Sequence, residues 1–216
     1  MSGKIILLIG GSGGGKSSLI KRLRTEYTHV RFIPSVTTRP KRPTEIDGAS
    51  YHFVDVKTFQ QLIQDDGFIE YAHVHRAWYG TPRQAYVDVL EQDQIVIKDI
   101  DPKGAANFKR LFNDQVITIF VSVPPDLMKE RLLMRGDTPE FEARLVDYEE
   151  AWKERDHYDY MIENIDFETA YADLLKIIAI IFQRHDEEDA RERPLFVCRK
   201  ECLCYRIIHY YRRFKP

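Results

Sequence analysis

Cysteine, long apolar runs and excess charge of one sign are all scarce in this sequence. The three cysteines, Cys198, Cys202 and Cys204, lie near the carboxyl terminus, so no disulfide can tie the body of the chain together, and we expect a reducing, cytoplasmic setting. No stretch approaches the ~20 apolar residues of a membrane-spanning helix, so we expect no membrane partner. The apolar run Lys4–Ile9 opens directly into glycines and does not resemble a signal peptide.

The charges of the chain nearly cancel. Its 32 Lys and Arg face 34 Asp and Glu, for a formal net charge of −2, so no overall field attracts nucleic acid, and we expect none as a partner. Hydrophobic residues make up 44% and charged residues 31% of 216 residues. That balance is typical of a globular α/β domain with room for small inserted units.

Apolar runs alternate with helical patterns along the chain. The segments 4–9, 94–98 and 116–123 have the continuous aliphatic character of strands buried on both faces. Helical patterns follow them, and a strongly periodic one covers 167–183. This alternation predicts an α/β fold, a parallel sheet with helices on both faces.

Residues 33–90 have a different character, with turn signals, short aromatic strand candidates and one helix near 56–65. We therefore predict a core of residues 1–32 and 91–183 that carries 33–90 as an insertion. A lid at about 135–145 lies between two helices. A charged and then basic, tyrosine-rich extension runs from 184 to 216.

A glycine-rich segment follows the first predicted strand and opens a helix. The residues from Gly10 to Ser17 fit G-x-x-x-x-G-K-[ST], the P-loop pattern, in the context that the pattern requires. Glycines let backbone N–H groups curl around a phosphate, Lys16 reaches the β- and γ-phosphates, and the Ser17 hydroxyl ligates Mg²⁺. The predicted ATP-binding residues here are Gly10, Gly11, Ser12, Gly13, Gly14, Gly15, Lys16, Ser17 and Ser18.

A second cationic site lies at the start of the insertion. Arg39 and Arg42 are each followed by proline, which stiffens the segment that carries them. Such a pair suits a phosphate monoester, which has a charge of roughly −1.5 to −2.

The order of several motifs resembles the guanylate kinase family, over residues 4 to about 183. The matching segments are 35–43, 47–53, 68–70, 79–83, 99–101 with Gly104, and 131–136. The resemblance implies a P-loop NTPase-type sheet with an inserted mixed α/β monophosphate-binding subdomain and a lid. It also implies in-line transfer of the γ-phosphoryl group of ATP to GMP, and to dGMP as well, with Mg²⁺ as cofactor.

The resemblance assigns the GMP site residue by residue. Its predicted members are Ser35, Arg39, Arg42, Tyr51, Glu70, Tyr79, Gly80, Thr81 and Asp101. The arginines and tyrosines would hold the phosphate. A carboxylate such as Glu70 accepts from guanine N1 and N2, while Ser35 and Thr81 hydroxyls donate to O6 and N7. Adenine has a different pattern, so it would leave these groups unpaired.

The catalytic and metal sites also follow from the resemblance. The predicted catalytic residues are Lys16, Arg39, Asp99, Arg131, Arg135 and Arg144, the last three as core and lid arginines. Asp99 would organise Mg²⁺ with Ser17, directly or through water, at the end of a strand where ligands of open α/β sheets gather. Asn164 would lie beside the ATP adenine.

Two other functions remain open at this point. Lysine at position 103, where the family usually has glutamine, and a shortened lid favour a kinase for dGMP or a modified purine monophosphate. A non-catalytic guanylate-kinase-like interaction module is the other alternative, although Lys16, Arg39 and Arg42 are all present.

The P-loop also departs from the family pattern. Position 11 is glycine where the family usually has proline, and together with Gly14 this predicts a looser loop. Some of the predicted site residues also have a purely structural interpretation. Tyr51 and Tyr79 could be core aromatics of the insertion, and Arg131 could be a solvated side chain on a helix.

The tail departs most from the family. Its cysteines with His209 could supply metal ligands, but the spacing is not a familiar zinc pattern, and an apolar packing role is the alternative. The basic and aromatic stretch 199–216 could contact RNA, a membrane surface or an oligomeric partner, or pack on the domain. The sequence does not determine the oligomeric state.

Overall fold

The structure is a computed structural model, and its described part covers most of the predicted core and insertion. It comprises residues 3–11, 13–27, 30–74, 76–134, 148–149, 152–153 and 155–192, with the backbone alone from 183 onward. None of the helices in this part is both long and apolar enough to cross a membrane.

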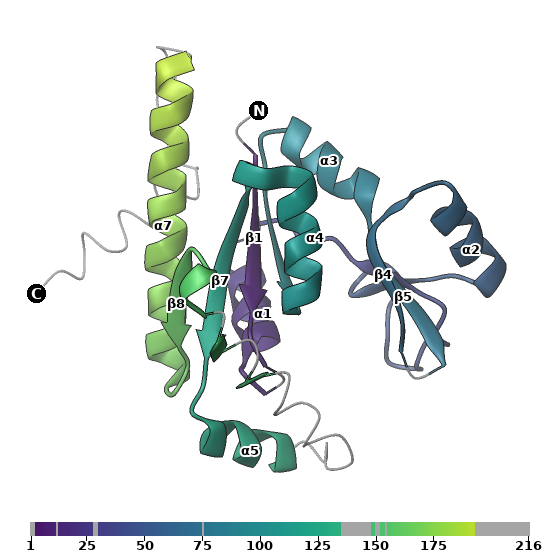
Figure 1. Ribbon diagram of the computed structural model, residues 1–216, viewed down its shortest axis with the longest axis horizontal. Helices are drawn as coiled ribbons and strands as arrows, with labels where there is room; N and C mark the ends of the chain where they lie inside the picture. The colour runs from purple at the N-terminus through teal and green to yellow at the C-terminus, as the bar shows by residue number, and fades with distance from the viewer. Residues whose placement is uncertain are drawn as a thin grey trace, which may run out of the picture.

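Four parallel strands form the central sheet of the molecule (Figure 1). They are β1 (Lys4–Ile9), β6 (Ile95–Ile100), β7 (Val116–Ser122) and β8 (Tyr160–Glu163), in the order β6-β1-β7-β8. In β1 the side chains from Ile5 to Ile9 are at most 1% exposed, as expected for a strand covered on both faces.

Helices cover both faces of this sheet. They are α1 (Lys16–Glu26), α3 (Arg83–Glu91), α4 (Pro102–Phe112), α5 (Pro125–Met134) and α7 (Phe167–Glu192), with short 3-10 turns at Asn113–Gln115 and Arg155–His157. One buried cluster joins the sheet to α1 and α7, through residues such as Leu19 and Leu174. The other joins it to α3, α4 and α5, through Tyr86, Phe108 and Met128. The predicted α/β fold with helices on both faces is confirmed.

A second, smaller sheet stands to one side of the core, next to α3 (Figure 1). Its strands are β3 (Tyr51–Phe53), β2 (Ser35–Thr37), β5 (Ala77–Pro82) and β4 (Phe68–Val74), in the order β3-β2-β5-β4. The β2–β3 pair is parallel and the other pairs are antiparallel. Helix α2 (Val56–Gln64) covers this sheet, because the ring of Phe59 stacks on Phe68 and Trp78.

The last helix is longer than the sequence pattern predicts. We expected it to end near Gln183, but α7 continues to Glu192, so that prediction is wrong. The apolar periodicity ends at 183 because the following residues are charged, yet charged residues such as Glu and Arg are good helix formers. The predicted boundary therefore marked a change of composition rather than the end of the helix.

Candidate active site

The P-loop connects β1 to α1 with a backbone that favours glycine. Gly15, the N-cap residue of α1, has a φ of 84°. A Cβ at this position would lie 2.2 Å from Nδ2 of Asn164. A side chain at Gly15 would therefore meet both backbone strain and a collision.

Asn164 lies directly behind this loop and is 1% exposed. Its Nδ2 donates to the carbonyl oxygen of Gly14 at 2.7 Å, and its backbone N–H donates to Ser122 at 2.8 Å. Its Oδ1 has no hydrogen-bond partner among the described residues. The structure thus places this side chain against the loop backbone, while its predicted contact with adenine stays a prediction.

The P-loop hydroxyl meets a carboxylate from the neighbouring strand. Ser17 Oγ donates to Asp99 Oδ2 at 2.7 Å, across 82 residues of sequence, because β6 is the neighbour of β1 in the sheet. Hydroxyl and carboxylate oxygens are the ligands that Mg²⁺ prefers, so this pair fits the predicted metal site. The described part of the chain contains no group of three or more His, Cys, Asp or Glu residues that could hold a metal ion.

Lys16 is bent back over its own loop. Its Nζ donates to the carbonyl oxygens of Gly10 at 2.6 Å and Gly11 at 2.9 Å. The ammonium group therefore lies against the backbone of the loop, and its contact with the β- and γ-phosphates stays a prediction.

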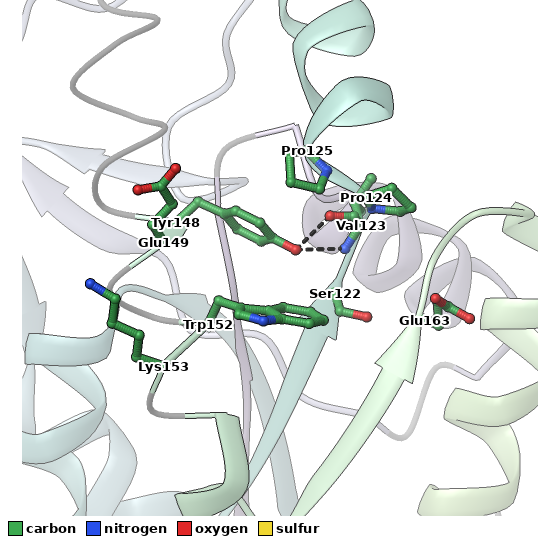
Figure 2. A pocket seen from close by; sticks show the side chains of 9 residues that line it. All are labelled: Ser122, Val123, Pro124, Pro125, Tyr148, Glu149, Trp152, Lys153 and Glu163. Atoms are coloured by element: carbon green, nitrogen blue, oxygen red, sulfur yellow. Dashed lines mark hydrogen bonds between the residues drawn. The ribbon is translucent and has the colours of Figure 1, made fainter.

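Gly11 is packed against the ring of Tyr148. A Cβ at Gly11 would lie 2.7 Å from Cδ2 of this ring, so the loop is supported where the sequence predicted slack. The Tyr148 hydroxyl accepts from the Val123 backbone N–H at 3.2 Å and donates to the Val123 carbonyl. Figure 2 shows this hydroxyl pointing at Val123.

Tyr148 also lines a pocket of about 450 Å³ (Figure 2). Its lining residues are Ser122, Val123, Pro124, Pro125, Tyr148, Glu149, Trp152, Lys153 and Glu163. The pocket lies between the carboxyl ends of β7 and β8, and sequence reasoning gave no indication of it.

Three predicted phosphate ligands come together on the second sheet. The rings of Tyr51 and Tyr79 are 5.9 Å apart, and the guanidinium of Arg39 lies 5.6 Å from the centre of the Tyr51 ring. Burial raises the pKa of the Tyr51 hydroxyl, and the charges of Tyr79 and Asp99 raise it further. Tyr51 therefore remains a neutral hydrogen-bond donor.

Glu45 is a partner of this cluster that sequence reasoning missed. Its carboxylate takes hydrogen bonds from both Arg39 Nη atoms, at 2.6 and 3.0 Å, and from the Arg42 backbone N–H at 2.7 Å. These bonds, first that from Arg39, lower the pKa of Glu45 to about 2. A glutamate within the arginine- and proline-rich segment was the available signal. The side chain of Arg42 is exposed.

The predicted guanine ligands lie beyond this cluster, toward the core. Thr81 is opposite Glu70 in the β4–β5 ladder, and its Oγ1 donates to Glu70 Oε1 at 3.2 Å. Burial raises the pKa of Glu70, an effect that the charge of Lys98 opposes. Gly80, on β5, fits beneath the ring of Phe68.

Lys98 is a second residue that sequence reasoning missed. It lies on β6, is 8% exposed, and its Nζ donates to Ser35 Oγ at 3.0 Å. Burial lowers the pKa of Lys98, while the charges of Glu70, Asp99 and Asp101 raise it. The signal was a single charge inside an apolar strand.

The remaining predicted residues are placed less directly. Asp101 caps α4, since its side chain accepts from the Gly104 N–H at 2.7 Å. Arg131 Nη2 donates to the Ile165 carbonyl at 3.1 Å, beside Asn164. Ser18 is exposed on α1. Outside the described residues lie Ser12, Arg135, Arg144, Cys198, Cys202, Cys204, His209 and the predicted lid.

A parallel sheet whose first strand runs through a glycine-rich loop into a helix defines a P-loop nucleotide-binding fold. The profile of the guanylate kinase family matches residues 2–180. The chain belongs to the guanylate kinase family.

Relatives agree over most of their length. A guanylate kinase of Carboxydothermus hydrogenoformans is 36% identical over 179 residues, which cover 82% of this chain and 87% of the relative. One of Symbiobacterium thermophilum is 39% identical over 180 residues, covering 82% and 84%. The crystal structure of guanylate kinase from Anaplasma phagocytophilum superposes with a TM-score of 0.61 at 27% identity, covering 82% of this chain and 84% of that one.

Proposed function

We propose that this protein transfers the γ-phosphoryl group of ATP to GMP, and to dGMP as well, forming ADP and GDP or dGDP. The observation that carries the proposal is the pairing of two anion-binding sites, one on each sheet. In support of it, Ser17 of the P-loop is hydrogen-bonded to Asp99, and Arg39 and Tyr79 both lie close to the Tyr51 ring on the second sheet. One site for a triphosphate and one for a monophosphate are what such a transfer requires.

The predicted site residues divide the work of the reaction. The P-loop N–H groups and Lys16 hold the triphosphate, and the Arg39 cluster holds the GMP phosphate. An oxygen of that phosphate attacks the γ-phosphorus, an O–P bond forms, and the bond to the β-bridging oxygen breaks as ADP leaves. Because no side chain needs to become a nucleophile, positioning and charge neutralisation supply most of the catalysis.

Ser17 and Asp99 are the residues that would hold Mg²⁺, since their oxygens lie together at the mouth of the loop. The metal would supply charge neutralisation on the β- and γ-phosphates. We further propose that residues 33–90 act as the GMP-binding insertion on a core of 1–32 and 91–183. In that arrangement Arg131, Arg135 and Arg144 close over the reacting phosphoryl group. We also propose that the protein works in the cytoplasm.

An acceptor panel tests this proposal. ATP consumption with Mg²⁺ is measured against GMP, dGMP, AMP, UMP, CMP and dTMP, with Lys16→Ala as the inactive reference. Turnover on GMP and dGMP that the substitution abolishes is the expected result. Turnover on another acceptor alone, or on none, would overturn the assignment.

A further inference from the structure

Lys98 is an unusual residue for its position. It lies in β6 after Val96 and Ile97, both 0% exposed, and is itself 8% exposed. A lysine is almost never buried to this extent without partners, because taking an ammonium group out of water is costly. Its partners therefore indicate what the side chain does.

The hydrogen-bond partner of Lys98 comes from the other sheet. Its Nζ donates to Oγ of Ser35, the first residue of β2, at 3.0 Å. The contact joins the core sheet to the predicted base site across 63 residues of sequence. The carboxylates of Glu70, Asp99 and Asp101 act on the same ammonium group and offset part of its burial.

This contact determines what the Ser35 hydroxyl can do next. A hydroxyl has one O–H to donate and two lone pairs that accept, and it normally rotates to suit its ligand. When its oxygen accepts from an ammonium group, one lone pair is occupied and the O–H turns away from the positive charge. The ammonium group therefore orients the hydroxyl and favours donation to a ligand on the opposite side.

The two kinds of purine differ at the atom that such a donor would meet. A 6-oxopurine has an acceptor at O6, whereas adenine has the N6 amino donor there. A freely rotating serine could serve either base equally, whereas an O–H that is oriented toward the ligand favours the first.

We propose that Lys98 is a specificity-determining residue that orients the Ser35 hydroxyl as a donor and so favours 6-oxopurine monophosphates at the acceptor site. This inference rests on the proposed function, because it deepens the base recognition of that same site. Lys98 acts through Ser35, so it is a positioning residue rather than a catalytic one.

The first test compares GMP with AMP as acceptors, at saturating ATP and Mg²⁺, for the full chain and Lys98→Met. Methionine keeps the length of the side chain but cannot donate. We expect the KM for GMP to rise about tenfold, because the Ser35 hydroxyl loses the hydrogen bond from a charged group that orients it. The kcat for GMP should stay within about twofold, so the preference for GMP over AMP in kcat/KM falls by about tenfold or more. The matched control is Lys57→Met, on the exposed surface of α2, which should change neither constant.

A double-mutant cycle shows whether the effect passes through Ser35. Because Lys98 works only through this hydroxyl, Lys98→Met should change the preference little once Ser35→Ala is present. Effects that add in full would overturn the proposal, as would an unchanged preference in Lys98→Met. Lys98→Gln, which keeps an N–H donor without the charge, should restore part of the preference, and it replaces Lys98→Met in the cycle if that variant fails to fold.

The wild-type protein separates this inference from the proposed function. Absence of GMP turnover in the wild type would contradict the proposed function itself. An active wild type whose preference is insensitive to Lys98 would contradict only the role of Lys98.

Discussion

The P-loop and the site on the second sheet are built from different parts of the chain. The loop is a contiguous segment whose backbone is proposed to bind the triphosphate, and the side chains of Tyr148 and Asn164 contact it. The proposed monophosphate and base site has no contiguous segment, since β2, β3, β4 and β5 each contribute side chains and β6 adds Lys98. The first site depends on backbone shape, and the second on the mutual placement of charged and polar groups.

The largest effect should come from Lys16, the cation of the P-loop. Lys16→Ala removes the cation next to the phosphates but leaves the backbone in place, so we expect kcat to fall by about a thousandfold. Steady-state kinetics measure this, with circular dichroism as the folding control. Lys176→Ala, on the exposed side of α7, should be unaffected. A Lys16→Ala enzyme within tenfold of wild type would show that backbone alone suffices at this site.

A substitution in the proposed monophosphate site should change the KM for GMP rather than kcat. Arg39→Lys keeps the charge but loses the paired N–H groups, so the KM for GMP should rise roughly 10- to 100-fold while the KM for ATP stays unchanged. Initial-rate measurements with each substrate varied in turn separate the two constants. Arg110→Lys, exposed on α4, is the matched control. An equal rise in both KM values would argue against two independent sites.

A smaller effect, on stability, should follow from adding a side chain at Gly11, where the Tyr148 ring packs against the loop. Gly11→Ala places a methyl group 2.7 Å from the position of Tyr148 Cδ2, so we expect a loss of about 1–3 kcal/mol in the free energy of unfolding. Urea denaturation measures this loss. Tyr148→Phe in the same background keeps the ring, so it should not relieve the loss. Tyr148→Ala should relieve part of it, and a Gly11→Ala protein as stable as wild type would show that the ring moves aside.

The smallest effect should be a dependence on pH that only the second site has. An ordinary glutamate has a pKa of about 4.3. Burial raises the pKa of Glu70, so this carboxylate protonates at a higher pH than an ordinary glutamate does. As the pH falls toward this raised pKa the charged acceptor is lost, and the KM for GMP should rise a few-fold. The Glu70→Gln variant serves as the reference, since the phosphates titrate equally in both proteins. Identical pH profiles for the two proteins would exclude the carboxylate as the source.

The sequence predicted the parts of the fold that depend on local pattern. Continuous aliphatic runs identified β1, β6 and β7, and the P-loop motif placed Lys16 and Ser17 at the start of α1. The Ser17–Asp99 contact was also predictable, because a carboxylate at the end of a neighbouring parallel strand lies next to the loop.

Contacts between side chains from distant segments could not be predicted in the same way. Lys98 has a charge where its strand predicts an apolar residue, but only the position of Ser35 on another sheet explains it. Tyr148 reaches Gly11 from a segment with no motif of its own. The length of α7 was missed because composition changed at 184 while helix propensity did not.

The pairing of Arg39 with Glu45 has a consequence for how the acceptor arrives. Glu45 takes two of the five N–H donors of Arg39 and offsets part of its charge, so an incoming phosphate meets an arginine that is already partly neutralised. Such an arginine attracts an anion from a distance less strongly than an unpaired one does. The association rate of GMP should therefore respond to ionic strength less steeply than the number of arginines in this segment suggests.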